Sequence, residues 1–105
     1  MEEVIISKVE ADCATLGYCV REVNSPDFIP YPGGWLIALA YQSSGMYDYH
    51  FYKKQNETIW MHKPGTREVM QWDFSYCVIT DPKHCDRGKY DTFVGYYEIA
   101  PNIFD

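Results

Sequence analysis

Three stretches between residues 35 and 62 have the pattern of β-strands connected by short turns. They are Trp35–Tyr41, Tyr47–Lys53 and Thr58–His62. The first is apolar on both faces, which is typical of a strand in the centre of a sheet. The second alternates in polarity, with Asp48, His50 and Tyr52 on one face. We therefore expect an antiparallel meander with short hairpin loops.

A helix is expected before this meander. Apolar residues recur at helical spacing in residues 2–16, and they are Ile5, Val9, Cys13 and Leu16, with Gly17 placed to end the helix. Tyr18–Val23 and Phe93–Ile99 read as further strands, and Val69–Phe74 and Tyr76–Thr80 as weaker ones. The sequence predicts an α+β fold: one N-terminal helix packed on a mainly antiparallel sheet of about five to six strands. No linker or repeat is visible, so residues 1–105 form a single domain.

Composition limits the classes of function. Aromatic residues make up 17% of the chain, including ten Tyr, and the net charge is -6. An acidic chain lacks the basic stripe that nucleic-acid binding requires, so we expect no nucleic-acid partner. No apolar run is long enough for a membrane span, and Met1–Ile6 does not resemble a secretory signal. These features predict a cytosolic protein that does not bind membranes.

The cysteines do not match a known metal pattern. Cys13, Cys19, Cys77 and Cys85 have none of the spacings of zinc sites, and in a cytosolic protein they are expected to be free thiols. We therefore predict no cofactor and no metal ligand. A mixed site built from His62, Cys77, His84 and Cys85 is the alternative that these residue types leave open.

Two histidines form the most suggestive pair. A hairpin centred near residue 56 would place His50 directly opposite His62, with both side chains on one face of the sheet. Two imidazoles in that position can act as a base and its orienting residue, or as half of a metal site. The alternative is that each is a half-buried histidine whose polar atoms are satisfied by a neighbouring Tyr hydroxyl.

A nucleophile is harder to assign. Cys13 is the only cysteine on the expected helix, but it lies on the apolar stripe near the C-terminal end, whereas reactive thiolates favour helix N-termini and cationic neighbours. The polar loop around Asp86 and Arg87 favours a turn held by local contacts.

Several motifs resemble those of a protein family. They are Tyr49-His50-Phe51-Tyr52, Trp60-Met61-His62-Lys63-Pro64-Gly65, Ile79-Thr80-Asp81-Pro82, Asp86-Arg87-Gly88 with Tyr90, and Phe93-Val94-Gly95-Tyr96-Tyr97. In combination they resemble the tail region of a family of uncharacterised bacterial and phage-borne proteins. That region is distantly similar to the tail of papain-like cysteine hydrolases of the NlpC type. Longer members carry an upstream Asn-Cys segment, which we do not expect here, and Lys53 stands where the family usually has Arg.

The resemblance implies roles for three residues: Cys13 as nucleophile, His50 as base and His62 as its orienting residue. Because the nucleophile is poorly placed, the leading hypothesis is a small domain that binds a protein or a small molecule through an aromatic, histidine-bearing sheet face. A phage setting would make it an inhibitor of a host protein. The expected ligand-binding residues are Tyr49, Tyr52, Trp60, Lys63, Asp86 and Arg87. A cysteine hydrolase and a metal-binding domain are the alternatives.

Overall fold

The chain folds into one helix and a five-stranded antiparallel sheet in a computed structural model that describes residues 2–44, 48–64 and 67–102. The elements are α1 (Glu2–Thr15), β1 (Tyr18–Val23), β2 (Trp35–Tyr41), β3 (Tyr49–Lys54), β4 (Trp60–His62) and β5 (Thr92–Pro101). The α+β fold expected from the sequence is confirmed. Tyr47, where the second strand was expected to begin, lies outside the described residues. None of the described helices is long and apolar enough to cross a membrane.

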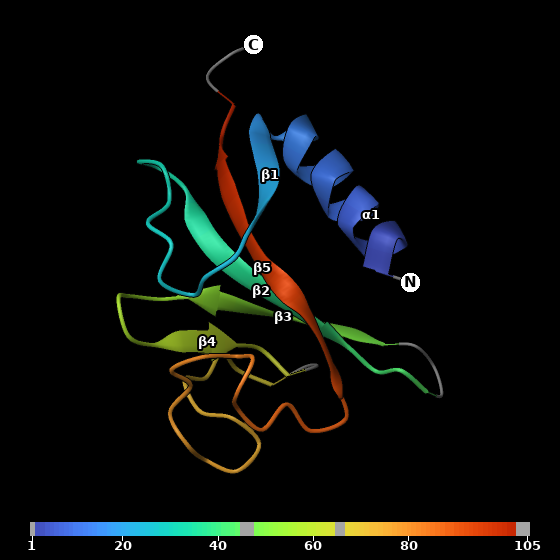
Figure 1. The fold of residues 1–105 in the computed structure, drawn as a ribbon, viewed down its shortest axis with the longest axis vertical. Coiled ribbons are helices and arrows are strands. Elements are labelled where there is room, and N and C mark those ends of the chain that lie inside the picture. The colour runs from blue at the N-terminus through green and yellow to red at the C-terminus, as the bar shows by residue number, and fades with distance from the viewer. Residues whose placement is uncertain (1, 45–47, 65–66, 103–105) are drawn as a thin grey trace.

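The sheet has the order β1-β5-β2-β3-β4, so the last strand of the chain lies between the first two (Figure 1). Both neighbours of β5 run antiparallel to it. β2 is buried along almost its whole length, as its two apolar faces predict. The register between β2 and β5 shifts between Leu39 and Ala40, as at a β-bulge.

α1 covers one face of the sheet. Ile5, Ile6 and Cys13 pack in a cluster with Leu39 and Tyr97. Leu16 does not take part, because the helix ends at Thr15 and Leu16 is exposed. Gly17, with a φ of 82°, turns the chain into β1, as the helix-ending role of glycine predicts.

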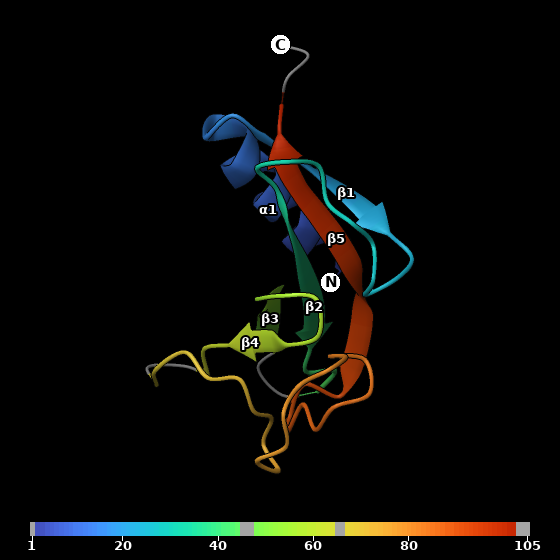
Figure 2. The same cartoon turned by 90° about the vertical axis from the view of Figure 1, so that its left-hand side faces the viewer.

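Residues 67–91 cover part of the other face and lie at the opposite end of the molecule from α1 (Figures 1 and 2). The cluster beneath it contains Leu36, Tyr52, Trp60, Ile79 and Tyr96. The strands expected at Val69–Phe74 and Tyr76–Thr80 are reduced to two single bridges, at Met70 and between Trp72 and Val78.

Side chains hold this segment in place where regular pairing does not. The Arg87 guanidinium donates hydrogen bonds to four backbone carbonyls, those of Pro82, Lys83, Tyr90 and Asp91. Tyr96 of β5 donates from its hydroxyl to Asp81. Because these partners are distant in sequence or depend on loop geometry, the pattern of apolar residues carries little information about them.

Candidate functional site

The hairpin between β3 and β4 does not place the two histidines opposite each other. His62 pairs with Tyr52, so the hairpin is centred on residue 57 and the prediction of direct opposition with His50 is wrong. The side chain of Asn56 accepts hydrogen bonds from the backbone amides of Thr58 and Ile59, so the turn extends to Ile59 and its centre moves by one residue. The displacement along the strand is two residues, so His50 and His62 still lie on the same face.

The two imidazoles meet along the diagonal. Nε2 of His50 lies 2.8 Å from Nδ1 of His62, and Nε2 of His62 lies 2.8 Å from the carbonyl oxygen of Trp72. A carbonyl only accepts, so Nε2 of His62 carries a proton and donates it to Trp72. In the neutral pair, Nδ1 of His62 is then an acceptor, and His50 donates to it from Nε2. This leaves Nδ1 of His50 as an unprotonated acceptor.

Aromatic rings enclose the pair on several sides. The His50 ring stacks on Tyr90 with centroids 4.6 Å apart, and the His62 ring stacks on Tyr52 at 5.2 Å. Phe74 contacts His62 edge-on. His50 is only 6% exposed and His62 only 3%. The pair is part of the core beneath residues 67–91, and the open sheet face expected from the sequence does not exist at this position.

Burial keeps both histidines neutral. It lowers the pKa of His50 to about 4, and the charge that His62 would carry adds to this shift. Burial also lowers the pKa of His62, against the hydrogen bond to the Trp72 carbonyl and the nearby carboxylate of Asp73, which raise it. Asp48 and Lys89 act on His50 in opposite directions. At neutral pH the pair therefore holds an imidazole in its basic form.

Nδ1 of His50 is the one nitrogen of the pair that makes no hydrogen bond to a described residue. Among these residues, the fully buried side-chain polar atoms without a partner are the Tyr52 hydroxyl and Trp60 Nε1. Chemically, the arrangement is a base whose ring is oriented by a second imidazole and a backbone carbonyl.

The structure does not bring Cys13 to the histidines. Cys13 packs in the cluster beneath α1, on the opposite face of the sheet, and burial raises the pKa of its thiol. Cys85 is closer, since it packs on the cluster that contains Tyr52. Burial raises the pKa of Cys85 to about 11, which keeps that thiol protonated. Neither cysteine is a thiolate beside His50.

The alternative metal set is also dispersed. His84 and Cys77 are exposed, whereas His62 is buried. Among the described residues, no group of three or more His, Cys, Asp or Glu side chains is placed to hold a metal ion.

The expected ligand-binding residues have different surroundings. Tyr52 and Trp60 are fully buried in the core, so neither is available to a ligand. Tyr49 lies on the other face of β3 and packs edge-on against Phe51. Asp86 and Arg87 hold residues 75–91 together through hydrogen bonds to Ser75, Gly88 and four backbone carbonyls. Lys63 is exposed.

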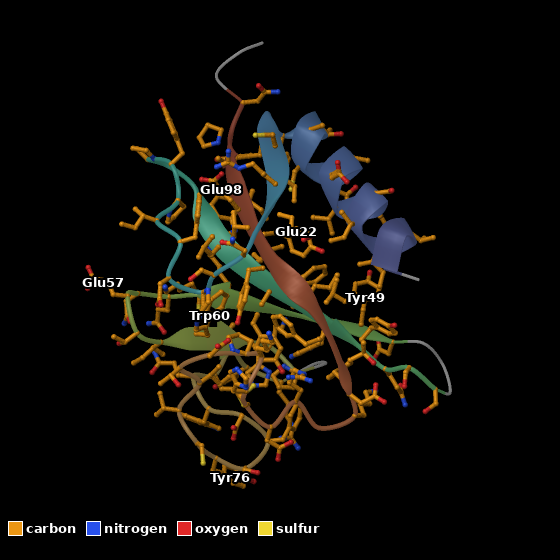
Figure 3. The ribbon with its side chains drawn as sticks, in the orientation of Figure 1. Glu22, Tyr49, Glu57, Trp60, Tyr76 and Glu98 are labelled. Carbon is orange, nitrogen blue, oxygen red and sulfur yellow. The ribbon has the colours of Figure 1, made fainter. Side chains whose placement is uncertain are left out.

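The structure reveals a surface that the sequence did not predict: five large apolar side chains exposed within ten residues. They are Val69, Trp72, Phe74, Tyr76 and Val78, and we call them the aromatic hairpin. The cross-strand bridge between Trp72 and Val78 and a hydrogen bond from the Asp73 amide to the Cys77 carbonyl form the hairpin's neck. Figure 3 shows Tyr76 at the lower end of the molecule, far from the sheet.

One buried carboxylate organises this hairpin. Asp73, 6% exposed, accepts hydrogen bonds from the backbone amides of Ser75, Cys77 and Asp86. Burial alone would raise the pKa of Asp73, but these three amides hold it below its usual value. Tyr76 at the tip has a φ of 62°, a left-handed conformation that is uncommon for an aromatic residue. The segment is therefore held in one strained, outward-pointing shape.

Comparison with known proteins gives one informative match. A segment of 54 residues, 51% of this chain, is 44% identical to "Insoluble matrix shell protein 1" of Ruditapes philippinarum. The chain spans 36% of the length of that relative. No family model matches the chain, and no solved structure matches it.

This match overturns the cytosolic placement expected from the sequence. The relative is named for a shell matrix, which lies outside the cell. The expectation rested on the first residues, Met1–Ile6, which lack the pattern of a signal peptide. That local pattern is weaker information about location than 44% identity over half of the chain.

Proposed function

We propose that this chain is a protein-binding domain that associates with other copies of itself through the aromatic hairpin. The observation that carries the proposal is the exposure of five large apolar side chains, between 41% and 84% each, on one ordered segment. Groups of exposed large apolar side chains on soluble proteins mark interaction surfaces. Aromatic side chains are also enriched where proteins bind one another.

The hairpin is suited to binding because it is already ordered. The Asp73 carboxylate accepts hydrogen bonds from three backbone amides at the neck of the hairpin. Nε2 of His62 donates a hydrogen bond to the Trp72 carbonyl. A surface that needs no ordering loses less conformational entropy on association. The strained Tyr76 presents its ring to solvent at 84% exposure. In this proposal the buried histidine pair supports the binding surface.

The name of the matched relative favours a second copy as the partner. "Insoluble matrix" describes an assembled state, and the proposal transfers that property to this chain. The net charge of -6 opposes association of identical copies at low ionic strength. Salt that screens this repulsion should therefore strengthen the association.

Sedimentation velocity tests the proposal. We expect the protein to form dimers or larger species as its concentration rises from about 10 μM to about 1 mM, and more so at higher salt. The double variant Trp72→Ser, Tyr76→Ser should stay monomeric. The matched control is Val4→Ser, Leu16→Ser, which removes two equally exposed apolar side chains on and beside α1.

Circular dichroism and urea unfolding establish that both double variants are folded. A wild-type protein that remains monomeric throughout this range contradicts the proposal. Association that both double variants reduce equally also contradicts the proposal, because it would be nonspecific association through any exposed apolar side chain.

A second candidate function is supported by the tautomers of the histidine pair. We propose it as a hydrolase-type centre in which His50 is the general base and His62 orients it. In the neutral pair Nδ1 of His50 is unprotonated and accepts no hydrogen bond from a described residue, while Nε2 is fixed by the 2.8 Å hydrogen bond to His62. The nucleophile would be water or a thiol other than Cys13, which lies across the sheet.

Hydrolysis of p-nitrophenyl acetate tests this candidate. We expect a rate above the buffer background that His50→Gln abolishes, because Gln can still donate to Nδ1 of His62 but cannot act as a base. His84→Gln serves as the control, since that histidine is exposed and outside the pair. The rate should fall as the pH drops through about 4, the pKa of His50. Equal rates for wild type and His50→Gln refute the candidate.

A further inference from the structure

A second group of exposed apolar side chains lies on the connection between β1 and β2. Ile29 is 87% exposed and Tyr31 is 49% exposed. Figure 1 shows this connection beside the upper part of the sheet, and Figure 3 shows Tyr76, at the tip of the aromatic hairpin, at the lower end of the molecule. The aromatic hairpin therefore points away from the connection of its own chain. A contact between these two surfaces would join two copies.

Ile29 lies between two hollows. One, of about 720 Å³, extends to the turn between β3 and β4, where Figure 3 shows Glu57. The other, of about 290 Å³, extends over the start of β1 and the end of β5. Phe28 and Ile29 line both hollows, and Tyr31 lines the smaller one. We call Phe28, Ile29 and Tyr31, with the hollow on either side, the ridge.

The ridge is held in place by contacts with the sheet. Glu98 of β5 accepts a hydrogen bond from the Tyr31 amide at 2.7 Å. Gly34 approaches β5 so closely that a Cβ at this position would lie 2.5 Å from the Ile99 carbonyl oxygen. Three prolines within residues 26–32 further restrict the backbone. The ridge, like the aromatic hairpin, therefore loses little conformational entropy on binding.

The shapes of the two surfaces favour contact of the aromatic hairpin with the ridge over contact with a second hairpin. The aromatic hairpin projects from the molecule, so two of its tips would touch over a small area only. Beside the ridge, its five apolar side chains would bury roughly 500 Å² of the surface that they expose. With a similar area from the ridge, the contact reaches the roughly 1,000 Å² that a specific interface needs. This is the lower end of the range, so the expected association is weak.

The distribution of charge favours the same arrangement. The exposed Asp86 carboxylate lies beside the aromatic hairpin, where it accepts a hydrogen bond from the Ser75 hydroxyl. A symmetric contact between two hairpins would bring two such carboxylates together. The Arg21 side chain lines the smaller hollow of the ridge, is 66% exposed and binds Glu98 through one guanidinium nitrogen. Its other N–H groups can donate to Asp86 of a neighbouring copy.

We propose that the aromatic hairpin of one copy binds the ridge of the next, so that copies join head to tail. This inference rests on the proposed self-association and names the surface that receives the aromatic hairpin. Each bound pair keeps one unoccupied hairpin and one unoccupied ridge. Such a contact continues from copy to copy into a ring or a filament, whereas a symmetric contact ends at a dimer.

Mixing two variants tests the proposal. The hairpin variant is Trp72→Ser, Tyr76→Ser, and the ridge variant is Ile29→Ser, Tyr31→Ser, which changes two exposed side chains. We expect each variant to be monomeric alone up to about 1 mM. The equimolar mixture should form a species of twice the mass of one chain and nothing larger, because one intact hairpin and one intact ridge remain to pair. The mass of the wild type should keep rising with concentration in sedimentation velocity.

Two controls accompany the mixture. Circular dichroism and urea unfolding establish that the variants are folded, and Ile29→Ser alone replaces the ridge variant if loss of the Tyr31 ring unfolds the chain. Val4→Ser, Leu16→Ser should associate as the wild type does. Amide NMR locates the contact: adding unlabelled ridge variant should shift residues 28–31 of the isotope-labelled hairpin variant. In the reverse labelling, residues 72–78 of the ridge variant should shift.

Three results would overturn the inference. A ridge variant that associates as strongly as the wild type would mean that hairpins pair with each other, and the proposed function would stand without the ridge. A mixture of the two variants that stays monomeric would show that the two surfaces do not bind each other. Shifts of the labelled hairpin variant outside residues 28–31 and their hollows would place the contact elsewhere. A wild type that never associates is a different failure, because it removes the proposed function itself.

Discussion

Nε2 of His50 donates to Nδ1 of His62 across 2.8 Å, although the two residues are not opposite each other in the sheet. The partner opposite His62 is Tyr52, whose ring stacks on that of His62. In the diagonal arrangement the two imidazole planes are nearly perpendicular, with an interplanar angle of 88°. Nε2 of His50 points at the ring nitrogen Nδ1 of His62, so the two rings form a hydrogen bond and do not stack on each other.

The first prediction concerns stability in mild acid. His50 has a pKa near its usual value of 6.5 when unfolded and about 4 when folded, so between these values the unfolded chain binds more protons. Stability is therefore fully present above about pH 6.5, and we expect a loss of up to about 3 kcal/mol as the pH falls to about 4. Urea unfolding across this range measures it.

His50→Gln is the control for this prediction. The amide can still donate to His62, but it does not titrate. Unfolding of the variant should therefore take up about one proton fewer than unfolding of the wild type, and its free energy should depend less steeply on pH. His84→Gln should leave that dependence as it is in the wild type. A stability curve that is flat between about pH 4 and about pH 6.5 contradicts the burial of a neutral pair.

The second prediction concerns Asp73. Asp73→Asn keeps one oxygen for the amides of Ser75 and Cys77, but it turns an NH₂ group towards the amide of Asp86. Two donors then face each other in a buried position, and we expect a loss of about 1–3 kcal/mol in the free energy of unfolding. Asp12→Asn, at an exposed position on α1, should change it by less than about 0.5 kcal/mol. Equal effects would show that Asp73 does not organise the hairpin.

The third prediction concerns two glycines. A Cβ at residue 34 would lie 2.5 Å from the Ile99 carbonyl oxygen, and the sheet backbone cannot move away cheaply. We expect Gly34→Ala to cost about 2–4 kcal/mol. Gly95→Ala places its Cβ at an ordinary 3.8 Å from the Tyr97 ring and should cost less than about 1 kcal/mol. Thermal unfolding ranks the two variants, and a Gly34→Ala protein as stable as Gly95→Ala refutes the close approach.

The fourth prediction concerns thiol reactivity. Cys19 and Cys77 are exposed, whereas burial raises the pKa values of Cys13 and Cys85, the latter to about 11. Iodoacetamide at mildly alkaline pH should label two thiols quickly and two slowly. Peptide mass spectrometry should find the slow label on Cys13 and Cys85. Rapid labelling of Cys85 at native pH would mean that this thiol is more open than its packing against Tyr52 implies.

Local patterns were sufficient for most of the sheet. Tyr18–Val23 and Trp35–Tyr41 were predicted with the bounds that β1 and β2 have, because polarity and glycine or proline boundaries are properties of neighbouring residues. The face shared by His50 and Tyr52 also followed from alternation. The register of the β3–β4 hairpin could not be predicted from alternation. Asn56 lengthens the turn through side-chain hydrogen bonds, and the spacing of apolar residues does not show these bonds.

The surroundings of the site could not be predicted in the same way. Whether His50 faces solvent depends on residues 67–91. Their order comes from hydrogen bonds of the Asp73 and Arg87 side chains to backbone groups and of the Tyr96 hydroxyl to the Asp81 carboxylate. The exposed hairpin has the composition of a strand, with Trp72, Phe74, Tyr76 and Val78 at alternate positions. That alternation was a usable signal of a shared surface, but the residue pattern does not say which side is buried.

Nitrogen NMR of the imidazole side chains tests the central claim most directly. At neutral pH, His50 and His62 should both be neutral with the proton on Nε2, and the spectrum should show a coupling from the His50 Nε2 proton to Nδ1 of His62. Neither ring should titrate until the pH falls well below 6.5, the usual histidine value. A proton on Nδ1 of His62, or titration of either ring near the usual value, would contradict the hydrogen-bonded pair described above.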